Sequence, residues 1–372
     1  MYSRFAWIVI VSGLTFSCAE ISAATIDSFS QTNLTSDLSG VANNTDPLLV
    51  NPWGIVASST SPFWIADNGS GMSTVYNGAG QPFPTASPLQ VTIPGPGNSG
   101  LGAPDGIVFN GTPANFGGSH FIFATEDGTV DAWTSGASAA QPVDISATGA
   151  VFKGLAIAGN DLYVTNFNAG TIDVFNSSFA PITVPGGFSD PSLPAGYAPF
   201  NIAFINGELY VTYAVQDGAK HDDVAGPGNG IIDVFNTSGV LQQRLVSNGG
   251  ALNSPWGLAI APAGFGPFGG DLLVGNFGDG TINAYDPTTG MFLGTLDNAN
   301  GNPIVNLGLW GLSFGNGSQG TSMNTLYFTA GIPGPDMVES HGLFGSLDPT
   351  PEPATVLLLI GGLAVVAGLK RR

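Results

Sequence analysis

One short block recurs six times along the chain and constrains the fold more than any other feature. It first occurs as Asn51-Pro52-Trp53-Gly54-Ile55, and an apolar, strand-like run follows each copy. Counted from the repeated glycine, the copies lie roughly 47 to 56 residues apart. The two central residues of the six copies are Trp53-Gly54, Asp105-Gly106, Lys153-Gly154, Phe200-Asn201, Trp256-Gly257 and Trp310-Gly311.

The third copy shows what each repeat contains. Three strand-like runs, 154–157, 161–166 and 170–176, are separated by short polar turns. Units of about 40 to 50 residues that hold several short strands are typical of β-propeller blades. With 55 glycines, 27 prolines and 10% aromatic residues, the composition also suits a turn-rich all-β protein. The sequence therefore predicts a single six-bladed β-propeller over 25–348.

The two ends of the repeat array predict how the ring closes. Residues 26–34 alternate apolar and polar side chains but precede the first block. The last copy has only three strand candidates, at 310–314, 324–329 and 342–347. Because an unpaired strand leaves exposed sheet edges, we expect the N-terminal strand to complete the last blade.

Both terminal segments have the sequence features of targeting signals. Met1–Ala24 has the basic start, apolar stretch and small-residue cleavage site of a secretory signal. Its Cys18 is the only cysteine, so disulfides are not expected in the mature chain. A lipoprotein signal ending at Cys18 is the less favoured alternative. The tail, 349–372, is predicted to contain a C-terminal hydrophobic helix over 354–369, short for a membrane span and followed by a basic end.

The tail resembles the PEP-CTERM sorting signal of exported bacterial proteins. It has the same three parts in the same order, Pro-Glu-Pro, a short apolar helix and a terminal basic cluster. The resemblance implies an exosortase-like sorting protease as a partner. It also implies an inner-membrane intermediate held through the C-terminal helix, and a final place at the cell surface or in the extracellular matrix. The residues that carry it are Pro351, Glu352, Pro353, Lys370, Arg371 and Arg372.

The start of the mature domain resembles a second family. Residues 34–40, 45–55 and 63–69 are similar to an uncharacterised family of secreted bacterial propellers, some of which carry such a tail. More distantly, the blades look like those of NHL-repeat proteins. The resemblance implies the propeller fold over nearly the whole mature chain, and it brings no established activity.

Charge and histidine content exclude several classes of function. The formal net charge is −19, and between the two terminal segments only Lys153, Lys220 and Arg244 are basic. Such a surface repels phosphate backbones, so we expect no nucleic-acid partner. The three histidines are far apart in sequence, so they form no His-x-x-x-His zinc motif. None lies beside a nucleophile elbow that would indicate a serine hydrolase.

The residues before the repeated glycine should form a ring around the central channel. The favoured interpretation is a buried aromatic plug in which Asp105 and Lys153, from adjacent blades, form an ion pair. The alternative is an aromatic platform for a sugar or another flat ligand, with Asp105 as a polar contact. The predicted ring is Trp53, Asp105, Lys153, Phe200, Trp256 and Trp310.

A second set of candidates lies near the ends of the second strands. Oxygen ligands that converge from several blades can bind calcium, although turns also favour Asn and Asp at these positions. These weak metal candidates are Asp67, Asn68, Glu126, Asn166 and Asn276. The cluster Lys220-His221-Asp222-Asp223 is interpreted as a solvated loop tip, with a surface cation site as the alternative.

Two functions follow as hypotheses. The first is an exported, non-enzymatic binding or structural module for an extracellular polysaccharide or a surface protein. The second is a calcium-dependent lactonase or related ester hydrolase with its site in the channel. It rests on analogy with other propellers together with the scattered Asn, Asp and Glu candidates. No cofactor other than possible calcium is expected.

Overall fold

The computed structural model describes residues 28–335 and 338–350. The described residues belong to one compact unit. The predicted signal peptide, the predicted C-terminal helix and the six sorting residues (Pro351, Glu352, Pro353, Lys370, Arg371, Arg372) lie outside the described residues. Among the helices that are described, none is long and apolar enough to cross a membrane.

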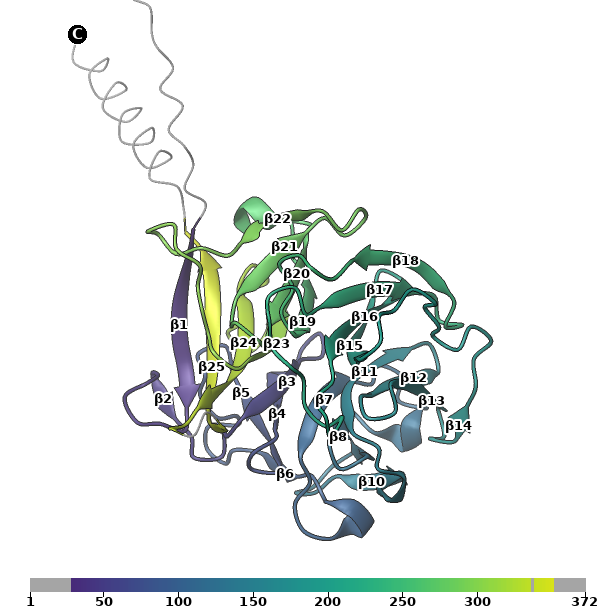
Figure 1. The fold of residues 1–372 in the computed structure, drawn as a ribbon. Coiled ribbons are helices and arrows are strands. Elements are labelled where there is room, and N and C mark those ends of the chain that lie inside the picture. Colours follow the sequence, from purple (N-terminus) through teal and green to yellow (C-terminus); the bar gives the residue numbers. More distant parts are fainter. Residues whose placement is uncertain (1–27, 336–337, 351–372) are drawn as a thin grey trace, which may run out of the picture. The chain divides into compact units, whose positions relative to one another are not determined.

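The described residues form six antiparallel blades, as the repeat predicts, and their first strands gather at the centre of the molecule (Figure 1). The first two blades are β3 (Pro52–Val56), β4 (Phe63–Asp67), β5 (Met72–Tyr76) and β6 (Gln90–Thr92), then β7 (Pro104–Phe109), β8 (Phe121–Thr125), β9 (Thr129–Trp133) and β10 (Ala140–Asp144). The next two are β11 (Phe152–Ala158), β12 (Asp161–Asn166), β13 (Thr171–Asn176) and β14 (Pro181–Ile182), then β15 (Tyr197–Ile205), β16 (Glu208–Val215), β17 (Ile231–Phe235) and β18 (Leu241–Val246).

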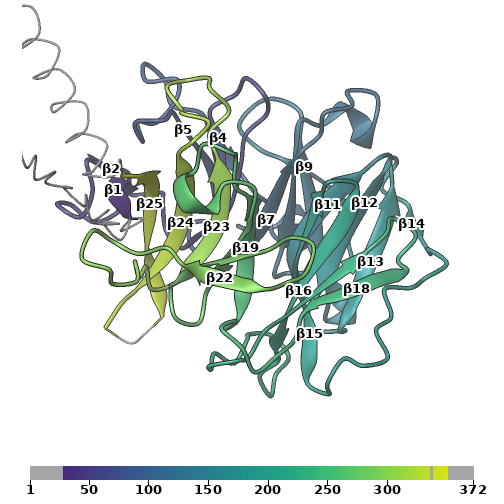
Figure 2. The ribbon, with the colours of Figure 1, turned by 90° about the horizontal axis from the view of Figure 1, so that it is seen from above.

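The fifth blade contains β19 (Pro255–Ile260), β20 (Leu272–Asn276), β21 (Ile282–Tyr285) and β22 (Phe292–Thr295). Within a blade the strands follow one another outward, and Figure 2 shows this for β11 on the inside and β14 on the outside. Each first strand packs against the next one around the ring. The four short 3-10 helices of the described residues lie in connections: η1 (Pro96–Asn98), η2 (Phe116–Gly118), η3 (Ser146–Thr148) and η4 (Gly266–Phe268).

The sixth blade closes the ring with strands from both ends of the described chain. Its inner strands are β23 (Leu309–Phe314), β24 (Leu326–Pro333) and β25 (Glu339–Pro349), and β1 (Phe29–Ser36) pairs antiparallel with β25. A short strand, β2 (Asn44–Thr45), adds outside β1. Figure 1 shows the purple β1 beside the yellow β25. The predicted closure by the N-terminal strand is confirmed.

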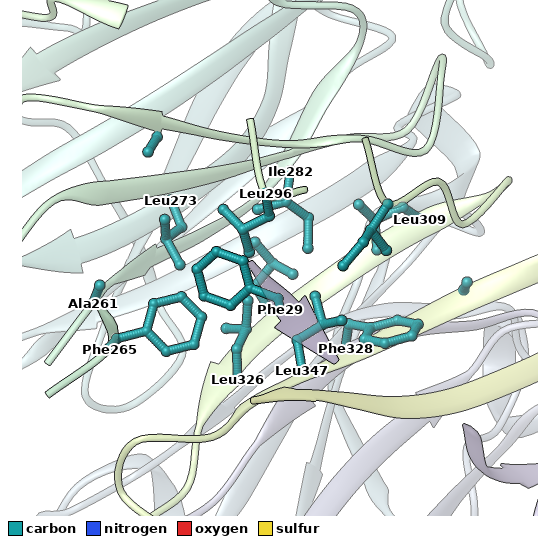
Figure 3. Close-up of a cluster of buried hydrophobic side chains, with 14 of the residues drawn as sticks. Phe29, Ala261, Phe265, Leu273, Ile282, Leu296, Leu309, Leu326, Phe328 and Leu347 are labelled. Atoms are coloured by element: carbon teal, nitrogen blue, oxygen red, sulfur yellow. The ribbon is translucent and has the colours of Figure 1, made fainter. Parts of the chain in front are cut away.

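Phe29 anchors this closing strand in the core. Its side chain is 2% exposed, and its ring centroid lies 4.9 Å from that of Phe265, in the connection between β19 and β20 of the neighbouring blade. Figure 3 shows Phe29 beside Phe265 and among Leu326 and Leu347 of its own blade. The closing strand is therefore held by side-chain packing across a blade boundary as well as by its hydrogen bonds.

The repeated glycine is required where neighbouring blades approach each other. A Cβ added at Gly257 would lie 2.6 Å from the carbonyl oxygen of Trp310, and one at Gly311 would lie 2.6 Å from that of Trp53. Both distances are too short for a real side chain. In the fourth blade Asn201 takes the glycine's place, and its Nδ2 donates to the carbonyl oxygen of Trp256 at 2.7 Å. The repeated block thus marks the contacts between blades.

Candidate functional site

An aromatic plug fills the middle of the channel. Trp53, Phe200, Trp256 and Trp310 come from four blades, and the rings of Trp53 and Trp310 stack with centroids 3.4 Å apart. The indoles are buried against each other, so little ring surface remains for a stacked ligand. Phe277 stacks on Trp310 at 4.0 Å and was not singled out from the sequence. The sequence did contain a signal for this residue. Phe277 directly follows the asparagine that ends a second strand, and Phe167, which also packs in the plug, holds the same position in the third blade.

On one side of the plug the channel is lined mainly by aliphatic side chains and backbone. A cavity of about 380 Å³ is lined by the first strands, including Ile55, Ile107, Leu155, Ile202 and Leu312. None of the described residues that line it is titratable. The channel groups that can do acid–base or ionic chemistry lie instead near the starts of the first strands. We call this end of the channel the channel mouth.

Lys153 is the centre of the channel mouth. Its side chain is 1% exposed, and its Nζ forms an ion pair with Glu126, from the turn after β8. Nζ also lies 4.8 Å from the centre of the Trp53 ring and 3.8 Å from Oδ1 of Asp222. The predicted Asp105–Lys153 ion pair is therefore corrected, because Glu126 takes the direct contact with the ammonium group.

Asp105 is instead part of a hydrogen-bond network that crosses blades. The Nδ2 of Asn68 donates to Oδ1 of Asp105 at 2.7 Å and to Oε2 of Glu126 at 2.9 Å. The Oδ1 of Asn68 accepts a hydrogen bond from Nδ2 of Asn51 at 3.4 Å. The Nδ2 of Asn51 also lies 3.5 Å from Oε2 of Glu339. One asparagine thus holds two carboxyl groups next to the buried lysine.

Five carboxyl side chains interact electrostatically with this ammonium group, and two of them, Glu126 and Asp222, form ion pairs with it. Three of the five come from parts that the repeat does not predict: Asp222 and Asp223 lie in the long connection 216–230, and Glu339 begins β25. The loop 220–223, interpreted from the sequence as a solvated tip, brings Asp222 toward Lys153 although Asp222 itself is 68% exposed. Glu339 was missed because it has no counterpart in the other blades. The five are Asp105, Glu126, Asp222, Asp223 and Glu339.

Burial is the main cause of the pKa shifts at the channel mouth, and neighbouring charges modify them. Burial raises the pKa of Asp105 well above its usual value, and the charge of Glu126 raises it further. Burial, opposed in part by Ser254 and Lys153, raises the pKa of Asp223 to about 6. Burial and the charge of Asp223 raise the pKa of Glu339 to about 7. Burial alone would lower the pKa of Lys153, but Glu126 and Asp105 outweigh it and raise that pKa.

These shifts predict that stability falls as the pH rises from about 4 to about 7. Over that range the folded protein keeps protons on Asp223 and Glu339 that the unfolded chain releases, so raising the pH favours unfolding. We expect Glu339→Gln, which cannot ionise, to flatten this dependence and to be more stable than the native protein at pH 8, by about 1 kcal/mol or more. Urea unfolding at several pH values measures this, and parallel curves for both proteins would contradict it.

The five weak metal candidates do not share one location. Asn68 and Glu126 meet through their hydrogen bond. The other three bond elsewhere. Asp67 accepts from Thr74 of its own blade at 2.7 Å, and Asn166 donates to Asp173 of its own blade at 2.9 Å. Asn276 donates to the carbonyl oxygen of Ala251, in the connection that precedes its blade, at 2.9 Å. Among the described residues a different group, Glu126, His221 and Asp222, offers metal-ligating atoms within 4.8 Å of one another.

Comparison with known proteins identifies relatives without an assigned activity. No protein-family model matches the chain. An uncharacterised protein of Acanthamoeba polyphaga mimivirus is 35% identical over 319 residues, covering 80% of this chain and 76% of the relative. A second uncharacterised protein of this virus is 33% identical over 328 residues, covering 84% of each.

The similarity of this chain to solved structures is limited to the fold. A Bacteroides thetaiotaomicron protein of unknown function matches with a TM-score of 0.53 and 11% identity, over 87% of this chain and 76% of that one. A streptogramin B lyase matches with a TM-score of 0.50 and 11% identity, over 87% of this chain and 98% of that one. A glucose dehydrogenase matches with a TM-score of 0.50 and 11% identity, over 85% and 99%. Similar six-bladed scaffolds therefore occur in enzymes as well as in proteins of unknown function.

Proposed function

Because the chain belongs to the same family as these uncharacterised mimivirus proteins, we propose a function from its own geometry: an exported propeller that binds a positively charged ligand at the channel mouth. The ligand classes that fit are a polysaccharide with free amino groups and a basic segment of a surface protein. Both would be found outside the cell, where the predicted signal peptide and sorting tail would deliver the protein.

The observation that carries the proposal is the excess of carboxyl groups over positive charge at the channel mouth. Five carboxyl side chains lie in the field of the Lys153 ammonium group, which is paired directly with Glu126 and Asp222. Asp222 and His221 are 68% and 47% exposed, so a ligand can reach them. The chain as a whole carries a formal charge of −19. A negatively charged surface of this kind attracts cations from a distance and repels anionic polymers.

We expect the purified protein to bind chitosan oligosaccharides or polylysine, and not dextran or alginate. Isothermal titration calorimetry at increasing salt should show weakening affinity. Asp222→Asn should weaken binding roughly two- to fivefold, the range for one exposed charge pair. Asp144→Asn is the matched control, since Asp144 is an exposed carboxylate on β10. Equal binding of charged and neutral polymers, or equal effects of the two substitutions, would refute the proposal.

Export through the C-terminal tail is a separate part of the proposal. The Pro-Glu-Pro segment and the terminal basic cluster support recognition by an exosortase-like protease at the inner membrane. Mass spectrometry of the protein recovered from the cell surface checks this part. A mature chain that still contains Lys370, Arg371 and Arg372 would contradict cleavage.

A channel-mouth hydrolase is the second candidate. Asp223 and Glu339 change protonation near neutral pH and lie in the field of Lys153, so they could donate and accept protons. The reactions to test are the hydrolysis of lactones and esters, with divalent metal added. Turnover that is lost in Glu339→Gln while the protein stays folded would favour this candidate over a pure binding module.

A further inference from the structure

We propose that Glu126, His221 and Asp222 bind a divalent transition-metal ion, Zn²⁺ or Mn²⁺, at the channel mouth. The inference rests on the proposed function in one respect: it takes the channel mouth to be the functional site. It joins Glu126, from the expected calcium set, to the 220–223 cluster, for which the sequence left a surface cation site as the alternative, and so forms a centre that neither set contains by itself.

The ligand set spans the channel mouth. Glu126 lies in the turn after β8, whereas His221 and Asp222 lie in the connection between β16 and β17, two blades further along. One ligand atom of each lies within 4.8 Å of the others, and Nδ1 of His221 is 2.9 Å from Oδ1 of Asp222. Small shifts of the exposed side chains of His221 and Asp222 would bring both onto an ion held by Glu126.

The chemistry of the three ligands selects the metal. Calcium and magnesium are bound by oxygen atoms. An imidazole nitrogen beside two carboxylates suits zinc, manganese or iron better. Zinc sites with His and carboxylate ligands are well known, and they need three protein ligands when an open position is kept for water or a ligand. His221 is therefore the residue that distinguishes this site from the calcium site expected from the sequence.

A second observation points to a missing cation. Asp105 is fully buried, and its Oδ2 has no hydrogen-bond partner among the described residues. Its Oδ1 shares the amide of Asn68 with Oε2 of Glu126, so this carboxyl lies directly behind the proposed ligand. A buried carboxylate oxygen without a donor is unfavourable. A divalent ion held by Glu126 would place a positive charge near this unpartnered oxygen.

Lys153 does not remove the need for a second cation. Its ammonium group contacts Glu126 and lies 3.8 Å from Asp222, so it competes for the same carboxylates. It supplies one positive charge against five carboxyl groups. The exposed sides of Asp222 and His221 remain open to solvent, and the ion would enter from there.

Calorimetric titration of the metal-stripped protein with ZnCl₂, MnCl₂, CaCl₂ and MgCl₂ tests the inference. We expect one site, with Zn²⁺ or Mn²⁺ bound at least tenfold more tightly than Ca²⁺. His221→Ala should weaken Zn²⁺ binding tenfold or more, without unfolding the protein, because this side chain is 47% exposed. His120→Ala is the matched control, since His120 is exposed on another part of the second blade.

Three results would overturn the inference: no binding of Zn²⁺ or Mn²⁺, calcium bound as tightly as they are, or equal losses from His221→Ala and His120→Ala. Glu126→Gln gives a second check, with circular dichroism to confirm folding, and unchanged affinity in that variant would also contradict it. Polymer binding is measured separately in chelator. Metal binding without polymer binding would refute the proposed ligand and support the metal site. Polymer binding without metal binding would refute the metal site and support the proposed ligand.

Discussion

Replacing Lys153 by methionine is expected to destabilise the folded protein by about 3–5 kcal/mol, the usual cost of removing one partner from a buried ion pair. The side chain is 1% exposed, and its ammonium group faces Glu126, Asp105 and Asp222. Methionine fills a similar volume but leaves these carboxylates without their cation. Urea unfolding at pH 8 measures the loss, and Lys220→Met, at an exposed lysine of the 216–230 connection, is the control.

The charge origin of that loss can be separated from packing. In the double variant Lys153→Met with Glu126→Gln, the second substitution should restore part of the stability, because it removes a carboxylate that the first left unpaired. The loss in Lys153→Met should also be smaller at pH 5, where the neighbouring carboxyl groups of Asp223 and Glu339 are protonated. A loss that is independent of pH and additive with Glu126→Gln would show that Lys153 acts only by filling space.

Phe29→Ala should cost about 3–5 kcal/mol, as for other buried phenylalanines. Phe29 joins the closing strand β1 to Phe265 of the neighbouring blade, so its loss weakens the ring where the two ends of the propeller meet. The variant should also aggregate more readily, because opening of β1 exposes the edge of β25.

Thr32→Ala, on the exposed face of the same strand, is the matched control and should change the stability by no more than about 0.5 kcal/mol. Thermal and urea unfolding of both variants measure the difference. Similar stability of the Phe29 and Thr32 variants would mean that hydrogen bonding to β25 closes the ring without help from the core.

The sequence by itself determined the number of blades and the way the ring closes. Both follow from local, repeated patterns: a glycine that must lie against the next blade, strands between polar turns, and one strand too few in the last repeat. The contact of Gly311 with the Trp53 carbonyl shows why this signal is strong, since any side chain there would collide with the first blade.

The composition of the channel mouth was decided by the tertiary structure. The repeat predicted that Lys153 and Asp105 lie near each other, but not that Glu126 would reach the ammonium group or that Asn68 would hold Asp105. Asp222 comes from a connection that occurs once in the chain, and Glu339, at the start of β25, has no counterpart in the other blades, so no periodicity places them. Side chains from non-equivalent loops meet only when the ring closes, and their charges acquire shifted pKa values only once they are buried together.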